Sequence, residues 1–183
     1  MNGPRTHAAR NAGRHQERVA LITRLADRAE LTDLIFRVGL CLDEHRFEDL
    51  ANLFVEDGVV VTPGGAARGR AALVAHATEN NAEFDRMQHV TTNVLIDFDD
   101  ESADGGAADA DAEAPLVGEH ARIRANIVAS FCQGADMHPV AARGGVSLGK
   151  AVRTADGWRL TELEARPTWA VQPHEPALHA AAG

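Results

Sequence analysis

The sequence contains no tyrosine, only two cysteines and no long apolar run. Cys41 and Cys132 lie far apart, each within an apolar segment, so we expect two buried thiols rather than a disulfide framework, as is typical of a cytoplasmic protein. Because no stretch of about 18 apolar residues occurs, we predict no membrane-spanning helix. The first residues contain no apolar segment of the kind found in secretory signals, and we expect residues 1–17 to form a disordered lead.

Basic residues are also scarce, because 18 lysines and arginines stand against 27 aspartates and glutamates, which leaves a net charge of −9. A protein that binds nucleic acid needs a basic face, so we do not expect nucleic acid as a partner. Much of the negative charge falls in residues 97–113, a segment without lysine or arginine that is rich in alanine and glycine. We predict a solvated acidic loop over residues 99–117. A calcium site is the alternative, although its acids lack the spacing of an EF-hand loop.

With 183 residues, 45% of them hydrophobic, the chain is long enough for one domain with a sizeable core. Helical spacing of apolar residues predicts one helix or two over residues 18–43, with a break near 26–29, and further helices over 47–54 and 70–81. Strands are predicted over residues 59–62, 86–98, 119–133, 145–155 and 157–170, with a hairpin turn at 155–157. This order predicts an α+β domain over residues 18–171, with helices packed against a curved, mainly antiparallel sheet, followed by a loose tail over 172–183.

Two ionisable residues stand near the ends of predicted elements. Asp43 ends the long apolar helix, and His89 lies near the start of the strand predicted over residues 86–98. An imidazole titrates near neutral pH, and a carboxylate bonded to one of its ring nitrogens fixes the tautomer and favours the protonated form. If both side chains enter one pocket, they form a general acid/base pair. The alternative is that each side chain only caps its own element.

Strand alternation suggests further polar groups for such a pocket. Asn93 is expected on the face of His89, where its amide would bond a substrate oxygen or, alternatively, satisfy backbone groups at a bend. Arg124 and Asn126 share one face of the next strand. They would line the pocket if that face is concave, and we favour a convex, solvated position for the arginine.

Phe36 and Trp169 are candidate walls for a flat apolar ligand, with a place in the ordinary core as the alternative. The histidines are dispersed and no dinucleotide-binding glycine motif is present. We therefore expect neither a metal site nor another cofactor.

Five segments, in this order, resemble the SnoaL-like branch of the NTF2-like superfamily, which includes polyketide cyclases, scytalone dehydratase and bile-acid dehydratase. They are LDEHRF at 42–47, LANLFVEDG at 50–58, GR at 69–70, HVTTN at 89–93 and DGWRL at 156–160. The resemblance implies a cone in which a strongly bent sheet wraps helices around a deep apolar pocket. It also implies that Asp43 and His89 occupy the positions of the family's working aspartate and histidine, whereas Val38 stands where its dehydratases usually carry a tyrosine.

The resemblance implies a cofactor-independent lyase or isomerase (a dehydratase, isomerase or cyclase) that acts on a small hydrophobic oxygenated metabolite, such as a polyketide or terpenoid-like intermediate. His89 would be the base and acid, Asp43 its orienting partner and Asn93 a polar anchor, with Val38 bordering the substrate. An epoxide hydrolase that uses Asp43 and Arg124 is one alternative, and a non-catalytic binding or scaffold protein is another. The resemblance also implies a homodimer.

Overall fold

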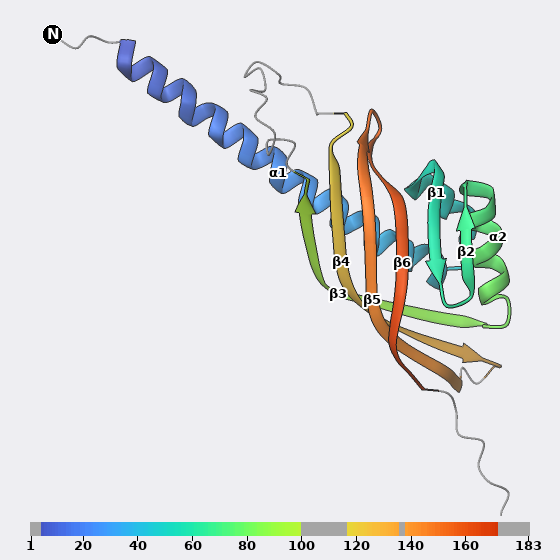
Figure 1. Ribbon diagram of the computed structural model, residues 1–183. Coiled ribbons are helices and arrows are strands. Elements are labelled where there is room, and N and C mark those ends of the chain that lie inside the picture. Colours follow the sequence, from blue (N-terminus) through green and yellow to red (C-terminus); the bar gives the residue numbers. More distant parts are fainter. Residues whose placement is uncertain (1–4, 100–116, 136–137, 172–183) are drawn as a thin grey trace, which may run out of the picture.

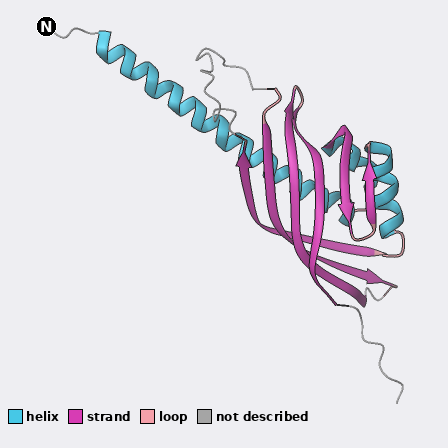
Figure 2. Ribbon diagram, in the orientation of Figure 1, coloured by secondary structure: helices cyan, strands magenta, loops and turns pink. Residues whose placement is uncertain are grey.

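The computed structural model describes residues 5–99, 117–135 and 138–171. Its elements are α1 (Arg5–Asp43), the 3-10 helix η1 (Phe47–Leu53), β1 (Phe54–Thr62), β2 (Gly65–Arg68), α2 (Arg70–Asn81), β3 (Arg86–Phe98), β4 (His120–Gln133), β5 (His138–Thr154) and β6 (Gly157–Val171). The described strands form one sheet in the order β2-β1-β6-β5-β4-β3. Within it β1 and β6 run parallel and the other neighbours antiparallel, which confirms the predicted α+β architecture (Figure 2).

The sheet is strongly curved, and its long strands β3 to β6 bend around the C-terminal part of α1 (Figure 1). The hairpin of β1 and β2, with α2 and η1, closes the other side of the fold, while the N-terminal part of α1 extends beyond the sheet. No helix among the described residues is long and apolar enough to cross a membrane. Most of the predicted acidic loop, and all of the predicted tail, lie outside the described residues.

The helix α1 differs from the sequence prediction at two points. It begins at Arg5, inside the segment expected to be a disordered lead, and it continues without interruption through residues 26–29. Alanine and arginine, which favour helices, are frequent in its first half, and no proline follows Pro4 before the helix ends. The predicted break is absent because Asp27 does not start a new helix but is buried inside α1, paired with Arg153 of β5.

Two clusters of buried side chains fill the concave side of the sheet. The first surrounds Trp158 and Leu160 of β6 and includes Leu31 and Ile35 of α1. The second lies nearer the end of α1 and includes Cys41, Phe47, Leu50, Phe84 and Phe131. Val38 packs against both clusters. Burial of this apolar surface stabilises the fold and holds the end of α1 against the middle of the sheet.

A β-bulge in β3 reverses part of the predicted strand pattern. Asn93 has a φ angle of 52°, and the pairing of β3 with β4 shifts register between Thr92 and Leu95. A bulge inserts one extra residue and so exchanges the two faces of the strand beyond it. The residues after the bulge therefore face the same side as His89, although uninterrupted alternation along the strand would place them on the opposite side: Val94, Ile96 and Phe98.

The strands also extend further than the sequence indicated. The strand β5 begins at His138, seven residues before its predicted start, and β1 begins at Phe54 instead of residue 59. The short strand β2 was not predicted at all, whereas α2 and the hairpin turn before Gly157 occur where the sequence placed them. Glycines hid the start of β5 and the whole of β2, because Gly144 and Gly145 within β5, Gly64 before β2 and Gly65 at its first position are typical of turns.

Candidate active site

Asp43 and His89 are joined by two hydrogen bonds. The backbone N–H of His89 donates to Asp43 Oδ2 at 2.9 Å, and His89 Nδ1 lies 2.6 Å from Asp43 Oδ1. The side chain of His89 is 8% exposed and that of Asp43 is 24% exposed. An ionised carboxylate only accepts hydrogen bonds, so this contact places the proton of a neutral ring on Nδ1 and leaves Nε2 as the free acceptor.

The fold brings these two residues together by packing the end of α1 against β3. Gly39, one turn before Asp43, faces His89, and a Cβ atom there would lie 3.2 Å from His89 Cβ. Asp43 is the last residue of α1, where a negative charge opposes the helix dipole by typically about 0.3–1 kcal/mol. Helix stability alone therefore does not favour an aspartate at this position, whereas its contacts with His89 do.

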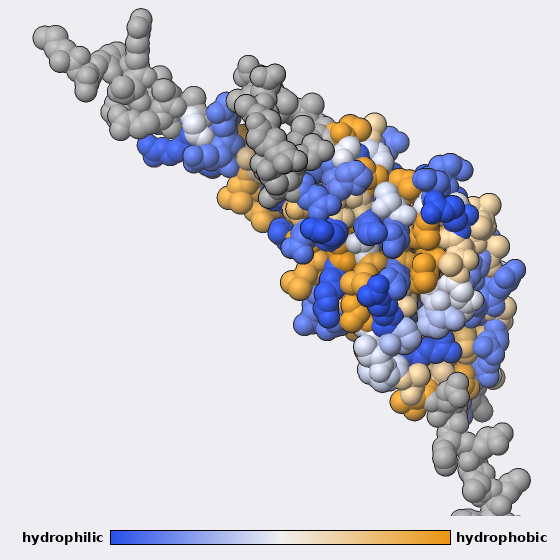
Figure 3. Space-filling model, viewed as in Figure 1, coloured by the Kyte–Doolittle hydropathy of each residue, from blue (hydrophilic) through white to orange (hydrophobic). Residues whose placement is uncertain are grey.

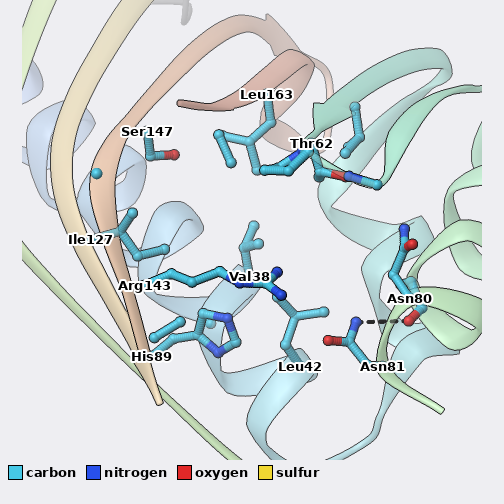
Figure 4. Close-up of a pocket in the computed structure, with 18 of the residues that line it drawn as sticks. Val38, Leu42, Thr62, Asn80, Asn81, His89, Ile127, Arg143, Ser147 and Leu163 are labelled. Carbon is cyan, nitrogen blue, oxygen red and sulfur yellow. Dashed lines mark hydrogen bonds between the residues drawn. The ribbon is translucent and has the colours of Figure 1, made fainter. Parts of the chain in front are cut away.

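His89 opens onto a cavity of about 490 Å³ between the sheet, α1 and α2 (Figure 4). Phe131 supports the ring from the side, with the ring centroids 6.0 Å apart in an edge-on arrangement. Most of the wall is apolar and includes Ile35, Val38, Leu42, Leu73, Ile127 and Leu163. The size and mainly apolar wall are typical of a small-molecule site.

Arg143 supplies a positive charge to this cavity and was not predicted from the sequence. His89 pairs with Ala129 of β4, which pairs in turn with Arg143 of β5, so the three residues form one row across the sheet. Figure 4 shows the Arg143 side chain extending into the cavity near His89. Its guanidinium carbon lies 5.3 Å from the centre of the Phe131 ring, and no carboxylate of the described residues forms an ion pair with it.

A second arginine at the cavity, Arg166, differs from Arg143 in its electrostatics. Its Nε and Nη2 donate to the two carboxylate oxygens of Glu164 at 2.6 and 2.7 Å. These hydrogen bonds raise the pKa of Arg166 and lower the pKa of Glu164. The charge of Arg166 is thus balanced on the outer side of the sheet, which leaves Arg143 as the better candidate to meet a negative charge in the cavity.

Of the six residues predicted to contact substrate, Val38 lines the cavity and the others do not. Asn93 is exposed at the bulge of β3, and Phe36 is exposed on α1. Arg124 and Asn126 lie on the outer face of β4, where Arg124 Nη1 donates to Asn126 Oδ1 at 3.3 Å. Trp169 of β6 also lies outside the cavity, with its ring over Gly144.

These differences have two physical causes. The bulge turned Asn93 outward, and the curvature of the sheet made the face of Arg124 and Asn126 convex, as was favoured for the arginine. Arg143 was missed because its Ala-Ala-Arg-Gly-Gly surroundings suggested a loop before β5. Strand alternation continued backward from Ser147 would have placed Arg143 on the cavity side.

Comparisons with known proteins identify the fold. Residues 23–164 match the family model of the SnoaL-like domain. Among solved structures, the chain is similar to a candidate scytalone dehydratase from Novosphingobium aromaticivorans, with a TM-score of 0.65 and 23% identity over 84% of this chain and 92% of that chain. It is also similar to a hexachlorocyclohexane dehydrochlorinase, LinA type 3, from Novosphingobium barchaimii, with a TM-score of 0.63 and 17% identity over 84% and 94% of the two chains.

A third similar structure is an NTF2-like protein with a cystatin-like fold from Novosphingobium aromaticivorans, with a TM-score of 0.60 and 22% identity over 92% of both chains. Among curated proteins, none matches this sequence. At these identities the likenesses establish the fold alone, and they confirm the predicted NTF2-like architecture.

Proposed function

Because this chain belongs to the SnoaL-like domain family, we propose that it is a cofactor-independent acid/base enzyme acting on a small apolar oxygenated molecule. The observation that carries the proposal is the position of His89. Its Nδ1 is held by Asp43 at 2.6 Å, and its ring forms part of the wall of a mainly apolar cavity. A base that is oriented on one side and open to a ligand on the other is what proton transfer at carbon requires.

In the proposed reaction, His89 Nε2 accepts a proton from a carbon next to a carbonyl group. The C–H electron pair shifts toward the carbonyl, and the carboxylate of Asp43 stabilises the imidazolium that forms. In a dehydration, the electrons then expel hydroxide from the neighbouring carbon, and the proton on His89 converts it to water. In an isomerisation, the same proton returns to a different carbon. Either sequence restores the neutral histidine.

In this proposal Arg143 supplies the hydrogen-bond donor that Val38 cannot, since Val38 stands where the family's dehydratases usually carry a tyrosine. Its guanidinium carries up to five N–H donors and a permanent charge, both suited to an oxygen on which negative charge develops. It stands two strands from His89 in the same row, so a ligand between the two side chains would contact both. We expect Arg143→Ala to lower kcat by on the order of 100-fold, as is typical when one charge-stabilising donor is removed.

The wall of the cavity suggests the substrate class. Its mainly apolar wall favours a compact hydrocarbon frame with few oxygen atoms, such as a polyketide or terpenoid-like intermediate. Two of the similar structures are named for reactions that remove a small group, as a dehydratase and a dehydrochlorinase. These names favour elimination over cyclisation for this chain.

The alternatives have less support. An epoxide hydrolase needs several carboxylates around a water molecule, but both oxygens of Asp43 are occupied by His89, and Arg124 lies on the outer face. A scaffold protein would have no need of an open cavity with an oriented base. The expected homodimer and cytoplasmic location remain predictions.

The test combines a ligand screen with three variants. β-Hydroxy ketones and β-halo ketones of one or two rings are screened for a rise in melting temperature, and the compounds that bind are incubated with the protein and analysed by mass spectrometry. We expect His89→Ala to lower turnover by about 100- to 10,000-fold and Asp43→Asn by a smaller factor, with the fold retained by circular dichroism. His120→Ala, on the outer face of β4, is the matched control and should retain full turnover. Undiminished turnover in folded His89→Ala protein contradicts the proposed role.

A further inference from the structure

Ser147 is a buried residue whose hydroxyl group has no hydrogen-bond partner among the described residues. The residue is 7% exposed, lies on β5 and lines the cavity. None of the described residues forms a hydrogen bond with its Oγ, and Figure 4 shows this oxygen directed into the cavity. This hydroxyl is not sealed inside the protein but opens into a ligand-sized cavity, where the oxygen of a ligand can form a hydrogen bond with it.

The position of Ser147 is remote from the reacting end of the cavity. Along β5 it lies four residues beyond Arg143, which corresponds to roughly 13 Å at the rise of a β-strand. Ser147 pairs with Ala165 of β6, and the pairing of Val61 with Glu164 places Thr62 of β1 beside Ala165. Ser147, Ala165 and Thr62 therefore form a second row across the sheet, and all three line the cavity.

Polar side chains of α2 extend this second row. Thr62 Oγ1 and Asn80 Nδ2 each lie 2.9 Å from His76 Nε2, and the backbone N–H of Gly64 donates to Thr62 Oγ1 at 3.2 Å. The amide nitrogen of Asn80 only donates, so Nε2 of His76 is the acceptor and a neutral ring carries its proton on Nδ1. No described residue accepts a hydrogen bond from this Nδ1, which leaves a second unused donor at this end.

Gly64 makes the α2 contact sterically possible. A Cβ atom at this position would lie 2.4 Å from Asn80 Oδ1, so any larger residue would displace the Asn80 side chain. His76, Thr62, Asn80 and Gly64 therefore form one connected unit at the β1 end of the row that contains Ser147. Between the His89 end and this second row the cavity wall is apolar at Ile127, which pairs with Gly145 of β5, midway between Arg143 and Ser147.

We propose that Ser147 and the Thr62–His76–Asn80 unit form a second binding site for oxygen, which selects ligands with a hydroxyl or carbonyl group at the end remote from His89. The ligand class is then a rigid, mainly apolar frame of about two fused rings with one oxygen at each end. This inference rests on the proposed function only in the choice of which end of the ligand reacts. Binding of the other end at the remote site does not depend on catalysis.

Two probes that differ by one oxygen test the remote site by isothermal titration calorimetry. They are 2-naphthol, with one hydroxyl, and 2,6-dihydroxynaphthalene, with a hydroxyl at each end of the same frame. We expect the unaltered protein to bind the diol at least ten-fold more tightly than the mono-ol. Equal affinities, or no binding of the diol, overturn the proposal.

Two variants assign the difference between the probes to the remote row. In Ser147→Ala and in Thr62→Val the preference for the diol should fall at least three-fold, while the affinity for 2-naphthol stays within two-fold. Ser130→Ala, on the outer face of β4, is the matched control and should keep the full preference. The melting temperature of Ser147→Ala should not fall, because no described residue forms a hydrogen bond with this hydroxyl. A preference that persists in both variants, or a marked loss of stability in Ser147→Ala, contradicts a ligand-binding role.

The same measurements separate this site from the reaction. His89→Ala should bind both probes with the diol preference intact, because its change lies at the other end. If His89→Ala retains turnover while Ser147→Ala loses the preference, the proposed base is wrong and the remote site stands. If the unaltered protein shows no preference for the diol but His89→Ala has lost turnover, the remote site is wrong and the proposed base stands.

Discussion

The buried ion pair between Asp27 and Arg153 allows a quantitative test of how α1 is attached to the sheet. Arg153 Nη2 bonds Asp27 Oδ1, and the two side chains are 8% and 6% exposed, in that order. Trp158 Nε1 donates to the same carboxylate oxygen at 3.4 Å, and the Arg153 guanidinium lies 4.7 Å from the centre of the Trp158 ring. Glu119 Oε2 lies 3.6 Å from Arg153 Nε and is its second acidic neighbour.

Removing one partner leaves the other charge buried, which costs about 3–5 kcal/mol in comparable pairs. Because Glu119 still balances part of the charge of Arg153, we expect Asp27→Leu to lower the free energy of unfolding by about 3 kcal/mol. Arg153→Met should lower it by a similar amount. The double variant replaces the pair with apolar groups, and we expect it to lose less than about 1 kcal/mol, because burying two charges offsets much of their attraction.

Urea denaturation measures these differences. With a slope of about 2 kcal/mol per M of urea for a domain of this size, each single variant should shift the midpoint by roughly 1.5 M. Trp158 reports the transition by fluorescence, and a Trp169→Phe background removes the signal of the exposed second tryptophan. Single-variant losses below about 1 kcal/mol, or losses that simply add in the double variant, would refute this account of the pair.

Four further predictions concern three other parts of the molecule. Gly39→Val should lower turnover by on the order of 100-fold with the fold retained by circular dichroism, because a side chain there displaces His89; unchanged kinetics would contradict this. Burial raises the pKa of the Cys41 thiol above its ordinary value of 9.0, so a thiol-specific disulfide reagent should modify it far more slowly than Cys132 at pH 8. Since the folded state favours the neutral thiol, the contribution of Cys41 to the free energy of unfolding is complete below pH 9 and declines as the pH rises further. Urea titrations of the unaltered protein and of Cys41→Ala at pH 8 and pH 10 should detect this decline. If the predicted homodimer uses the exposed apolar side of α1, Leu25→Glu should convert it to a monomer in analytical ultracentrifugation, whereas a monomeric unaltered protein would refute the dimer.

Local sequence patterns determined most of the elements. Twofold alternation located β3, β4 and β6, and the helical spacing of apolar residues located α2 with the observed bounds, Arg70–Asn81. These patterns are reliable because each depends on neighbours within a few residues. The pairing of Asp43 with His89 was also anticipated, but through resemblance to a family and not through local pattern.

Other features depended on contacts between residues far apart in the chain. The sequence did not indicate the bulge at Asn93, because a bulge is defined by the pairing of β3 with β4. The bulge and the curvature of the sheet decided which side chains face the cavity. They excluded Asn93, Arg124 and Asn126, and the extension of β5 brought in Arg143.

The amino-acid sequence by itself therefore determined the order and type of most elements and, with the family resemblance, indicated the contact between Asp43 and His89. The tertiary structure alone decided the chemistry of the rest of the cavity wall. The physical reason is that a side chain's direction on a strand reverses with every residue, so a single inserted residue or a change of curvature exchanges wall and surface. Arg143 and Ser147 belong to the cavity only because β5 pairs in this register with its neighbours.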